Sequence, residues 1–259
     1  MHSSLKISIA GSGKVARAFS LAFKDAGHSI AQIISRNTSS GADLAQEIGA
    51  SHVTLNDIIE NVDLIAVLVS DDAISEVSSA LPRETPQFHA SGVTSLDALK
   101  SETKGVVWPI KSINSKSTNS SLNGTPMALE ANEDGFYNAL SSVVKNVGGA
   151  GFSADSDQRA IIHLAAVFTD NFANHCLTLS QEILKSADLE TNLMSELSRG
   201  LVEGAREGDS RSRQTGVAIR GDVGSQLRHL DLLERDSQKE FYKYLSQKIK
   251  EYHELQGKT

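Results

Sequence analysis

The sequence predicts an α/β protein whose N-terminal half forms a doubly wound parallel sheet and whose C-terminal part is all-α. In the first half, short apolar runs alternate with stretches of helical spacing, which is the pattern of successive βαβ units. Val62–Val69 is β-branched and almost entirely apolar, as a central parallel strand buried on both faces should be. From Ser153 onward the apolar spacing is helical nearly throughout. We therefore expect one domain at residues 1–152 and a second at residues 153–259.

The elements of the first domain follow one another closely along the chain. Strands are expected at Leu5–Ala10, Ser29–Ser35, His52–Val53, Val62–Val69, Gln87–His89, Gly105–Trp108 and Thr125–Leu129. Helical segments are expected at Lys14–Asp25, Ser39–Ile48, Leu55–Glu60, Asp72–Ala80 and Glu133–Val147. The stretch Ser112–Thr125 is rich in Ser and Asn without periodicity, and we expect an exposed loop there. The second domain is expected to hold helices at Ser156–Lys185, Leu189–Glu207, Gln226–Arg235 and Gln238–Tyr252.

Composition and charge favour a cytoplasmic protein that acts on a small molecule. The 259 residues carry a net charge of −7 without a basic tract, so neither nucleic acid nor an anionic membrane is the expected partner. The single cysteine, Cys176, cannot form an internal disulfide and suits a reducing compartment. A strand-like run begins within a few residues of the N-terminus, which leaves no room for a signal peptide. No apolar run reaches the roughly 18 residues of a membrane span, and no histidine or cysteine spacing indicates a metal site.

The segment after the first strand has the spacing of a dinucleotide-binding loop. Gly11, Gly13 and Ala16 fit G-x-G-x-x-G/A, in which the first glycine permits a tight turn and the second a close approach of the pyrophosphate. Phosphates bind at the start of the following helix, where free N–H groups and the helix dipole favour anions. The cofactor-binding candidates here are Gly11, Ser12, Gly13, Lys14 and Val15. A purely structural turn is the alternative.

The end of the second strand favours NADP over NAD. An NAD site usually carries Asp or Glu about 20 residues after the glycines. This chain instead has Ser35, Arg36, Asn37 and Thr38, so no carboxylate repels a 2′-phosphate. Arg36 can pair with that phosphate through charge-assisted hydrogen bonds, and its three neighbours add short donors. An arginine on the surface with no ligand is the alternative interpretation.

Four segments of the chain resemble one known family in sequence and in order. They are DLIAVLVSDDAISEV (63–77), HASGVTSLDAL (89–99), IIHLAAVFTDNFANH (161–175) and TGVAIRGDVGSQLRHLDLL (215–233). Together they resemble Rossmann-like proteins with a C-terminal domain of unknown function, DUF2520. That family is related to pyrroline-5-carboxylate reductase, ketopantoate reductase and 6-phosphogluconate dehydrogenase. The resemblance implies a Rossmann domain, NADP-dependent redox chemistry and a helical dimerisation domain. Where such proteins often carry histidine after the sixth strand, this chain has Trp108, which excludes a catalytic histidine at that position.

The strand ends of a doubly wound sheet are where ligands bind. Val69, Ser70 and Asp71 follow the fourth strand and Ser91 and Gly92 follow the fifth, so we expect them beside the inner ribose and nicotinamide. Asp71 and Asp72 also suit the N-cap and first turn of the next helix, with capping expected of Asp72. His89 is a candidate acid or base, with a hydrogen-bonded structural histidine as the alternative.

The helix after the domain boundary offers a second set of polar residues. His163, Asp170 and Asn174 share one face at helical spacing, and Asn171 lies about 80° to one side. We interpret His163 as a proton donor, Asn171 as an orienting amide, and Asp170 and Asn174 as substrate contacts. The alternative is a satisfied core histidine that ties the helix to the sheet. The related dehydrogenases use a lysine on the corresponding helix, and this face has none.

The segment 215–222 adds a cation suited to an anionic substrate. Gly216 and Gly221 permit unusual backbone geometry, and Asp222 can cap the next helix. Arg220 can then bind a carboxylate or phosphate, with Thr215 beside it. In pyrroline-5-carboxylate reductase the resembling segment lies at the dimer interface and completes the partner's site. By that resemblance the chain forms a homodimer through its C-terminal helices.

Two functions from different classes remain open on the sequence alone. One is an NADP-dependent oxidoreductase that acts on a small anionic carbonyl or imine compound. The other is a catalytically silent NADP-binding sensor or scaffold, because no general acid stands where the related dehydrogenases carry theirs. Thermal melting with NADPH and NADH tests cofactor binding, and NADPH oxidation with a His163→Ala control separates the two hypotheses.

Overall fold

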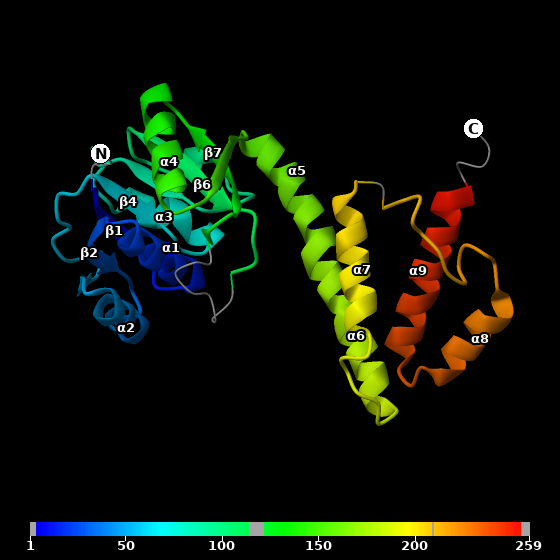
Figure 1. Cartoon of the computed structure of the whole chain (residues 1–259). Helices are drawn as coiled ribbons and strands as arrows, with labels where there is room; N and C mark the ends of the chain where they lie inside the picture. Colours follow the sequence, from blue (N-terminus) through cyan, green and yellow to red (C-terminus); the bar gives the residue numbers. More distant parts are fainter. Residues whose placement is uncertain (1–3, 114–121, 209, 255–259) are drawn as a thin grey trace. The chain divides into compact units, whose positions relative to one another are not determined.

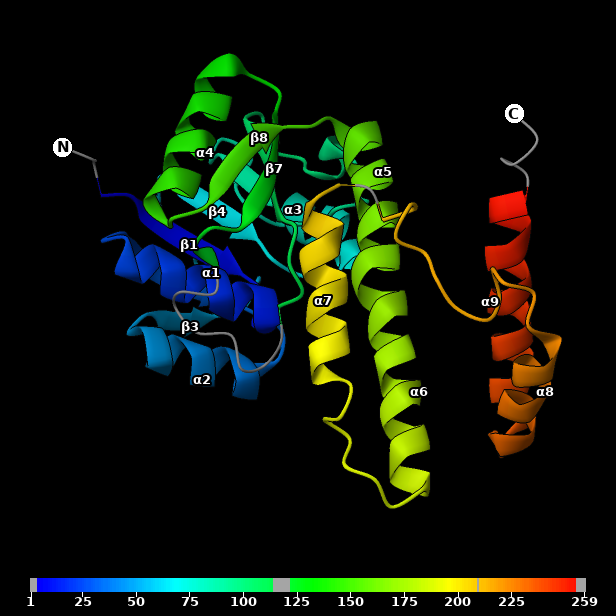
Figure 2. The same ribbon diagram turned by 45° about the vertical axis from the view of Figure 1, so that its right-hand side comes forward.

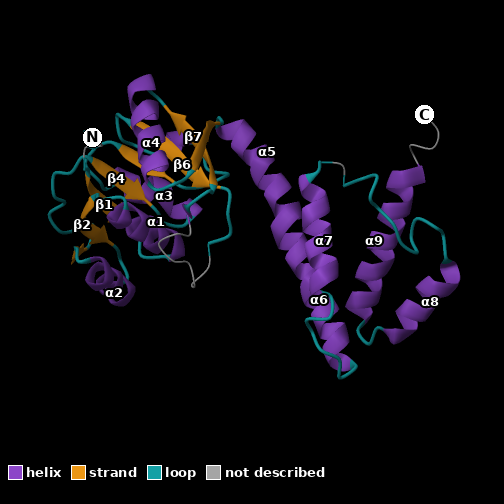
Figure 3. Ribbon diagram, in the orientation of Figure 1, coloured by secondary structure: helices purple, strands orange, loops and turns teal. Residues whose placement is uncertain are grey.

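The computed structural model describes residues 4–113, 122–208 and 210–254, and the chain divides into two compact units. The N-terminal unit comprises residues 1–170 and the C-terminal unit residues 171–259. All described strands lie in the N-terminal unit, whereas the C-terminal unit is helical (Figure 3). The expected division at residues 152 and 153 stays a prediction. The sheet itself ends at Ser153.

The N-terminal unit is built on one sheet (Figure 1). Its described strands have the order β3-β2-β1-β4-β5-β6-β7-β8. The strands are β1 (Lys6–Ala10), β2 (Ser29–Ile34), β3 (Ser51–Val53), β4 (Leu64–Val67), β5 (Gln87–His89), β6 (Lys104–Pro109), β7 (Pro126–Ala131) and β8 (Ala150–Ser153). From β3 to β6 every neighbouring pair is parallel, which confirms the expected α/β class. β7 runs antiparallel to β6, and β8 is parallel to β7. The order reverses direction at β1 and β4, which is the switch point where doubly wound sheets bind ligands.

Helices cover the sheet between the strands. They are α1 (Lys14–Asp25), α2 (Thr38–Ile48), the short 3₁₀ helix η1 (Asp71–Ala73), α3 (Ile74–Ser79), the 3₁₀ helix η2 (Leu96–Ala98) and α4 (Asp134–Asn146), while α5 (Ser156–Ala166) follows the last strand. α4 packs against β7 and β8, as Figure 2 shows. The expected helical segment at Leu55–Glu60 is wrong, because only a turn forms there. Its Asp57 carboxylate accepts the backbone N–H of Thr54 at 2.7 Å and closes that turn.

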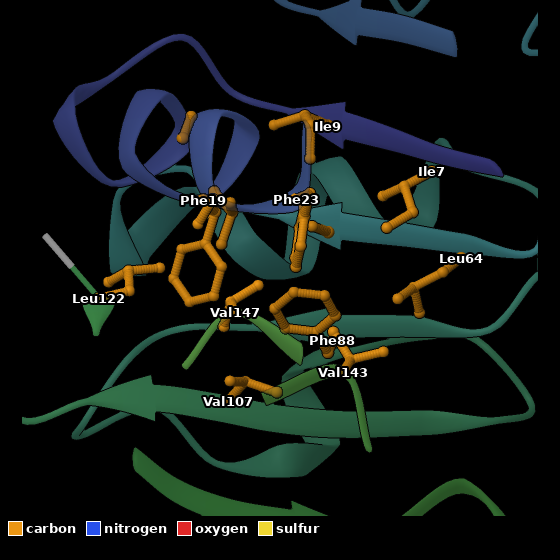
Figure 4. Packing of buried hydrophobic residues seen from close by; sticks show 14 of the residues in the cluster. Ile7, Ile9, Phe19, Phe23, Leu64, Phe88, Val107, Leu122, Val143 and Val147 are labelled. Carbon is orange, nitrogen blue, oxygen red and sulfur yellow. The ribbon is translucent and has the colours of Figure 1, made fainter. Parts of the chain in front are cut away.

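Every residue of β4 is apolar, because both faces of the strand are buried in the core. Leu64 and Ala66 belong to the cluster built around Phe19, Phe23 and Phe88, shown in Figure 4. Their neighbours on β4 point to the opposite face and join a second cluster with residues of α3. Alternating side chains on a strand face opposite sides of the sheet, so a strand covered by helices on both faces must be apolar throughout.

The C-terminal unit consists of helices that follow a π-helical segment. Val167–Phe172 forms that segment, and it is followed by α6 (Ala173–Ser186), α7 (Ser195–Arg206), α8 (Val223–Leu232) and α9 (Asp236–Glu254). The expected single α-helix over Ser156–Lys185 is therefore interrupted, and the helix expected from Leu189 begins at Ser195. His229 Nδ1 and the Tyr242 hydroxyl, 2.8 Å apart, join α8 to α9. None of the described helices has both the length and the apolar character of a membrane span.

Candidate functional site

A cleft of about 740 Å³ opens in the N-terminal unit at the carboxyl ends of β1, β2 and β4. Ten of the predicted cofactor-binding residues line it: Gly11, Ser12, Gly13, Lys14, Val15, Ser35, Arg36, Asn37, Val69 and Ser70. Apolar residues complete the lining: Ile34, Leu55, Leu68, Ala73, Val77 and Ile113. Thr38, Asp71, Ser91 and Gly92 are not among the residues that line the cleft. The glycine loop and the segment after β2 thus meet around one concave surface.

The glycine loop fits the close approach of an anionic group. Gly11 has φ +131°, and a Cβ there would lie 2.2 Å from the backbone oxygen of Leu68 on the neighbouring strand end. Gly13 is exposed, and a Cβ built on it would meet no atom within 4 Å. It is also the N-cap of α1 and supplies no side-chain hydrogen bond to the helix. The start of α1 is therefore open toward the cleft, as a phosphate-binding helix terminus requires.

The segment after β2 is held in place by its own hydrogen bonds. The buried Ser35 hydroxyl donates to the backbone oxygen of Asn37 at 2.8 Å. The Asn37 side chain accepts the N–H of Ser40 at 3.1 Å and caps α2. Ser40 also lies 2.8 Å, oxygen to oxygen, from Ser12 of the glycine loop. Arg36 is exposed at the cleft and has no carboxylate within ion-pair distance among the described residues.

His89, predicted as a candidate acid or base, is wholly buried and hydrogen-bonded on both ring nitrogens. Its Nδ1 accepts the backbone N–H of Ser91 at 3.1 Å, so Nε2 carries the proton and donates to the Ser95 oxygen at 3.3 Å. Burial, followed by the positive charge of Arg159, lowers the pKa of His89 to about 4, and the bond to Ser95 opposes that shift. The ring therefore stays neutral and fixes the loop after β5, which is the structural role kept open as the alternative.

Ser91, which is expected beside the nicotinamide, is hydrogen-bonded within the loop after β5. The Ser91 hydroxyl accepts the N–H groups of Val93 at 3.2 Å and Thr94 at 3.0 Å.

The N-cap of the turn after β4 is Ser70, not Asp72, and neither η1 nor α3 receives a side-chain cap. The capping role expected of Asp72 is wrong, because the chain turns two residues earlier.

Trp108, His163 and Gly92 form a compact cluster at the ends of β5 and β6. The indole of the buried Trp108 and the half-buried His163 ring lie 5.8 Å apart between centroids and are tilted by 41°. A Cβ at Gly92 would lie 2.6 Å from Trp108 Cε2 and 3.0 Å from His163 Cδ2. Neither ring nitrogen of His163 is hydrogen-bonded to any part of the chain that the structure describes. The glycine lets the two rings close over the backbone after β5.

Sequence reasoning missed Arg159, whose side chain is the largest that is fully buried in the described chain. Its guanidinium donates to the carboxylate of Glu130 on β7, to the Thr94 oxygen at 2.8 Å and to the Ser156 hydroxyl at 3.2 Å. A longer contact of 3.4 Å reaches the Ala154 oxygen. Nothing in the local pattern distinguishes this arginine from one on the surface, because its partners lie 29 and 65 residues away.

The π-helical segment changes the face on which the predicted polar residues lie. A π turn closes i→i+5 hydrogen bonds, so the 3.6-residue spacing assumed from His163 to Asn174 does not hold across residues 167–172. Asp170 accepts a hydrogen bond from the Ser112 hydroxyl within the N-terminal unit. Asn171 and Asn174 belong to the C-terminal unit, and both are exposed. Their proximity to His163 stays a prediction.

Two predicted substrate residues of the C-terminal unit, Thr215 and Arg220, lie on the exposed segment before α8. Gly216 and Gly221 have φ of +115° and +64°, which confirms that both adopt backbone geometry rare for other residues. Asp222 caps α8 as expected, accepting the N–H of Ser225 at 3.0 Å, and this bond lowers its pKa. The charges of Arg220 and Arg228 lower that pKa further. Thr215 lines a separate groove of about 580 Å³ between α6 and α9, whose walls are mainly apolar.

Comparisons with known proteins agree with this architecture. Residues 6–95 match the family described as NADP oxidoreductase, coenzyme F420-dependent, and residues 125–249 match the domain of unknown function DUF2520. A Bacteroides fragilis protein assigned as an NADP oxidoreductase is similar in structure, with a TM-score of 0.87 and 27% identity over 96% of this chain and 98% of that one. No curated protein matches the chain.

More distant solved structures share the fold. Pyrroline-5-carboxylate reductase from Streptococcus pyogenes has a TM-score of 0.64 and 15% identity over 96% of this chain and 99% of that one. An imine reductase from Myxococcus stipitatus, solved with NADP⁺, has a TM-score of 0.59 and 16% identity over 95% and 92% of the two chains. The chain is thus built like NAD(P)-dependent reductases. By sequence, residues 6–95 are similar to the F420-dependent NADP oxidoreductase family and residues 125–249 to the domain DUF2520.

Proposed function

We propose that the protein is an NADP-dependent oxidoreductase that transfers hydride between NADPH and a small anionic carbonyl or imine compound. The observation that carries this proposal is the cleft between the glycine loop and the segment after β2, with Arg36 at its edge. An oxidoreductase dependent on a nicotinamide nucleotide agrees with the family match at residues 6–95 and with the Bacteroides fragilis structure.

The predicted cofactor-binding residues, most of which line the cleft, follow the order of the parts of NADPH. Gly11 to Val15 would hold the pyrophosphate at the open start of α1. Ser35 to Thr38 would hold the adenosine ribose and its 2′-phosphate, with Arg36 as the cation. Val69 to Asp71, with Ser91 and Gly92, would lie toward the nicotinamide, because ligands of a doubly wound sheet cross the strand ends at the switch point. When bound, NADPH supplies the hydride.

The protein's own part in the reaction is to bind the substrate and to manage a proton. We assign the proton to a ring nitrogen of His163, which donates it to the carbonyl oxygen or imine nitrogen as the hydride arrives. Arg220 and Thr215 would bind the substrate's anionic group, while Asn171, Asp170 and Asn174 orient it. His89 is left out of this chemistry, because both of its ring nitrogens already have protein partners.

We also propose that the protein acts as a homodimer through its C-terminal helices. This proposal is supported by the small number of buried apolar side chains in the described part of the C-terminal unit. The resemblance to pyrroline-5-carboxylate reductase agrees with it. A dimer would allow Thr215 and Arg220 of one subunit to serve the site of the other.

Cofactor preference is the first test of the proposal. Isothermal titration should show that NADPH binds more tightly than NADH. Arg36→Ala should weaken NADPH binding about 10- to 100-fold, because charge-assisted hydrogen bonds contribute roughly 1.5–3 kcal/mol. NADH binding should stay unchanged. Arg83→Ala serves as the matched control, since Arg83 lies outside the cleft and bonds to the Lys100 oxygen. Binding of neither dinucleotide would contradict the proposal, and a preference for NADH would contradict the role of Arg36.

Turnover is the second test. NADPH oxidation should be followed against a panel of keto acids and cyclic imines. His163→Ala should lower kcat by about 10²- to 10⁴-fold, the usual contribution of a general acid, while NADPH affinity stays the same. Equal turnover of His163→Ala and the parent protein would remove His163 from the mechanism. NADPH binding without turnover of any compound would favour the sensor or scaffold alternative.

A further inference from the structure

The first turn of α5 is fixed by a buried charged group. Arg159 is 0% exposed, and its guanidinium contacts three segments: the loop after β5 through Thr94, β7 through Glu130, and the start of α5 through Ser156. Ser156 itself donates to the same Glu130 carboxylate at 3.1 Å. Parts of the chain that are far apart in sequence therefore meet at one side chain.

Stability alone is a weak explanation for this arginine. Burying an ion pair costs desolvation that the pairing often only offsets, and an apolar side chain of similar volume is frequently as stable. Here Arg159 Nε has no hydrogen-bond partner within the described structure, which adds to the cost. An apolar residue could not form directional hydrogen bonds to both Thr94 and Glu130. The benefit of Arg159 is therefore the position that these hydrogen bonds impose on α5.

The group that this geometry controls lies one turn further along α5. Residues four apart on a helix share a face, so the position of Arg159 determines that of His163. The His163 ring packs against Trp108, with Gly92 beneath both rings. Gly92 belongs to the same loop, 90–95, whose backbone at Thr94 accepts the Arg159 hydrogen bond. A shift of α5 relative to this loop would move His163 away from Trp108 and Gly92.

We propose that Arg159 is a positioning residue that holds His163 against Trp108 and Gly92 by fastening α5 to Thr94 and Glu130. Its consequence for catalysis rests on the proposed function, in which His163 moves the proton. A catalytic group displaced by about 1 Å can lose about 100-fold in rate. The placement of the ring is a separate claim that needs neither cofactor nor turnover.

The sole tryptophan of the chain makes the placement measurable. The fluorescence of an indole depends on the ring packed against it, so Trp108 emission at a fixed neutral pH reports on the contact with His163. His163→Gln removes the imidazole, and the resulting change in emission defines the signal of that contact. Arg159→Met should produce at least half of the same change, and Arg159→Lys a smaller part of it. Arg17→Met, which removes a half-buried arginine paired with Glu47, is the matched control and should leave the emission unchanged.

Kinetics and binding complete the test. Arg159→Met should lower kcat about 10- to 100-fold, with KM and NADPH affinity changed less than twofold. Where Arg159→Met does not fold, Glu130→Gln keeps the arginine and weakens its partner, and the same change in emission is expected. A folded Arg159→Met or Glu130→Gln variant that keeps the emission of the parent protein would overturn the positioning role. The expected change in emission in a protein without any turnover would support the positioning role and count against the proposed reaction.

Discussion

Among single residues, His89 shows most clearly how burial decides chemistry. Its pKa in the folded protein is about 4, against 6.5 when it is exposed. Because the unfolded chain binds the proton more readily, the stabilisation is complete above pH 6.5 and is lost as the pH falls toward 4. The free energy of unfolding should therefore drop by about 2 kcal/mol between pH 7.5 and 5 through this group. His89 contributes stability that depends on its being neutral.

Urea unfolding followed by Trp108 fluorescence measures this effect in the N-terminal unit. In His89→Gln, which keeps hydrogen-bonding groups and does not titrate, the drop between the two pH values should be smaller by about 2 kcal/mol. The comparison cancels contributions from other groups, such as the buried His28, whose pKa is also lowered by desolvation. An equal drop in both proteins would show that His89 is protonated without cost in the folded state.

Residues were predictable from the sequence where their role is local. Gly11, Gly13 and the segment 35–37 act within one turn of the chain, and all of them line the cleft. Arg159 was not predictable, because its role depends on Thr94 and Glu130, which only the folded sheet brings to it. For the same reason, the burial of His89 could be stated only as an alternative.

At the scale of elements, strands were predictable where they are apolar and central. β5 was predicted with the bounds that form, and β4 was recognised from its continuous apolar run. β8 was missed because its sequence, AGFS, follows two glycines and lies at the sheet edge, where no apolar alternation is required. β7 runs antiparallel to β6, the pairing that does not require a helical crossover connection.

The π-helical segment is an element that periodicity cannot predict. Apolar spacing over Ser156–Lys185 is compatible with an α-helix, and a π turn of six residues changes that spacing only locally. Such turns are frequent at functional sites, and this one includes Asp170 and Asn171, two of the predicted site residues. The segment therefore changes the direction of side chains that the sequence had placed on one regular face.

For the whole molecule, the two units differ in how much of their apolar surface they bury. The N-terminal unit encloses three clusters of buried side chains. In the described part of the C-terminal unit, only Ala218 and Leu233 are buried among the apolar side chains. Leu197 and Leu201 on α7 are 72% and 71% exposed. A helical unit of this size cannot offset the entropy of folding without burying apolar surface, so a second copy is the partner we propose.

Removing one of these exposed leucines tests the homodimer. Leu201→Lys places a charge within the proposed interface and should shift the protein from a mass near twice 27.7 kDa to a single chain, as measured by light scattering after gel filtration. Glu203→Lys is the matched control, because it adds a lysine two residues along α7, on nearly the opposite side of the helix, and should leave the dimer intact. If Thr215 and Arg220 serve the partner's site, the monomer should also lose turnover while it still binds NADPH. A dimer that persists in Leu201→Lys would exclude this face of α7 from the interface, and a monomeric parent protein would contradict the proposal itself.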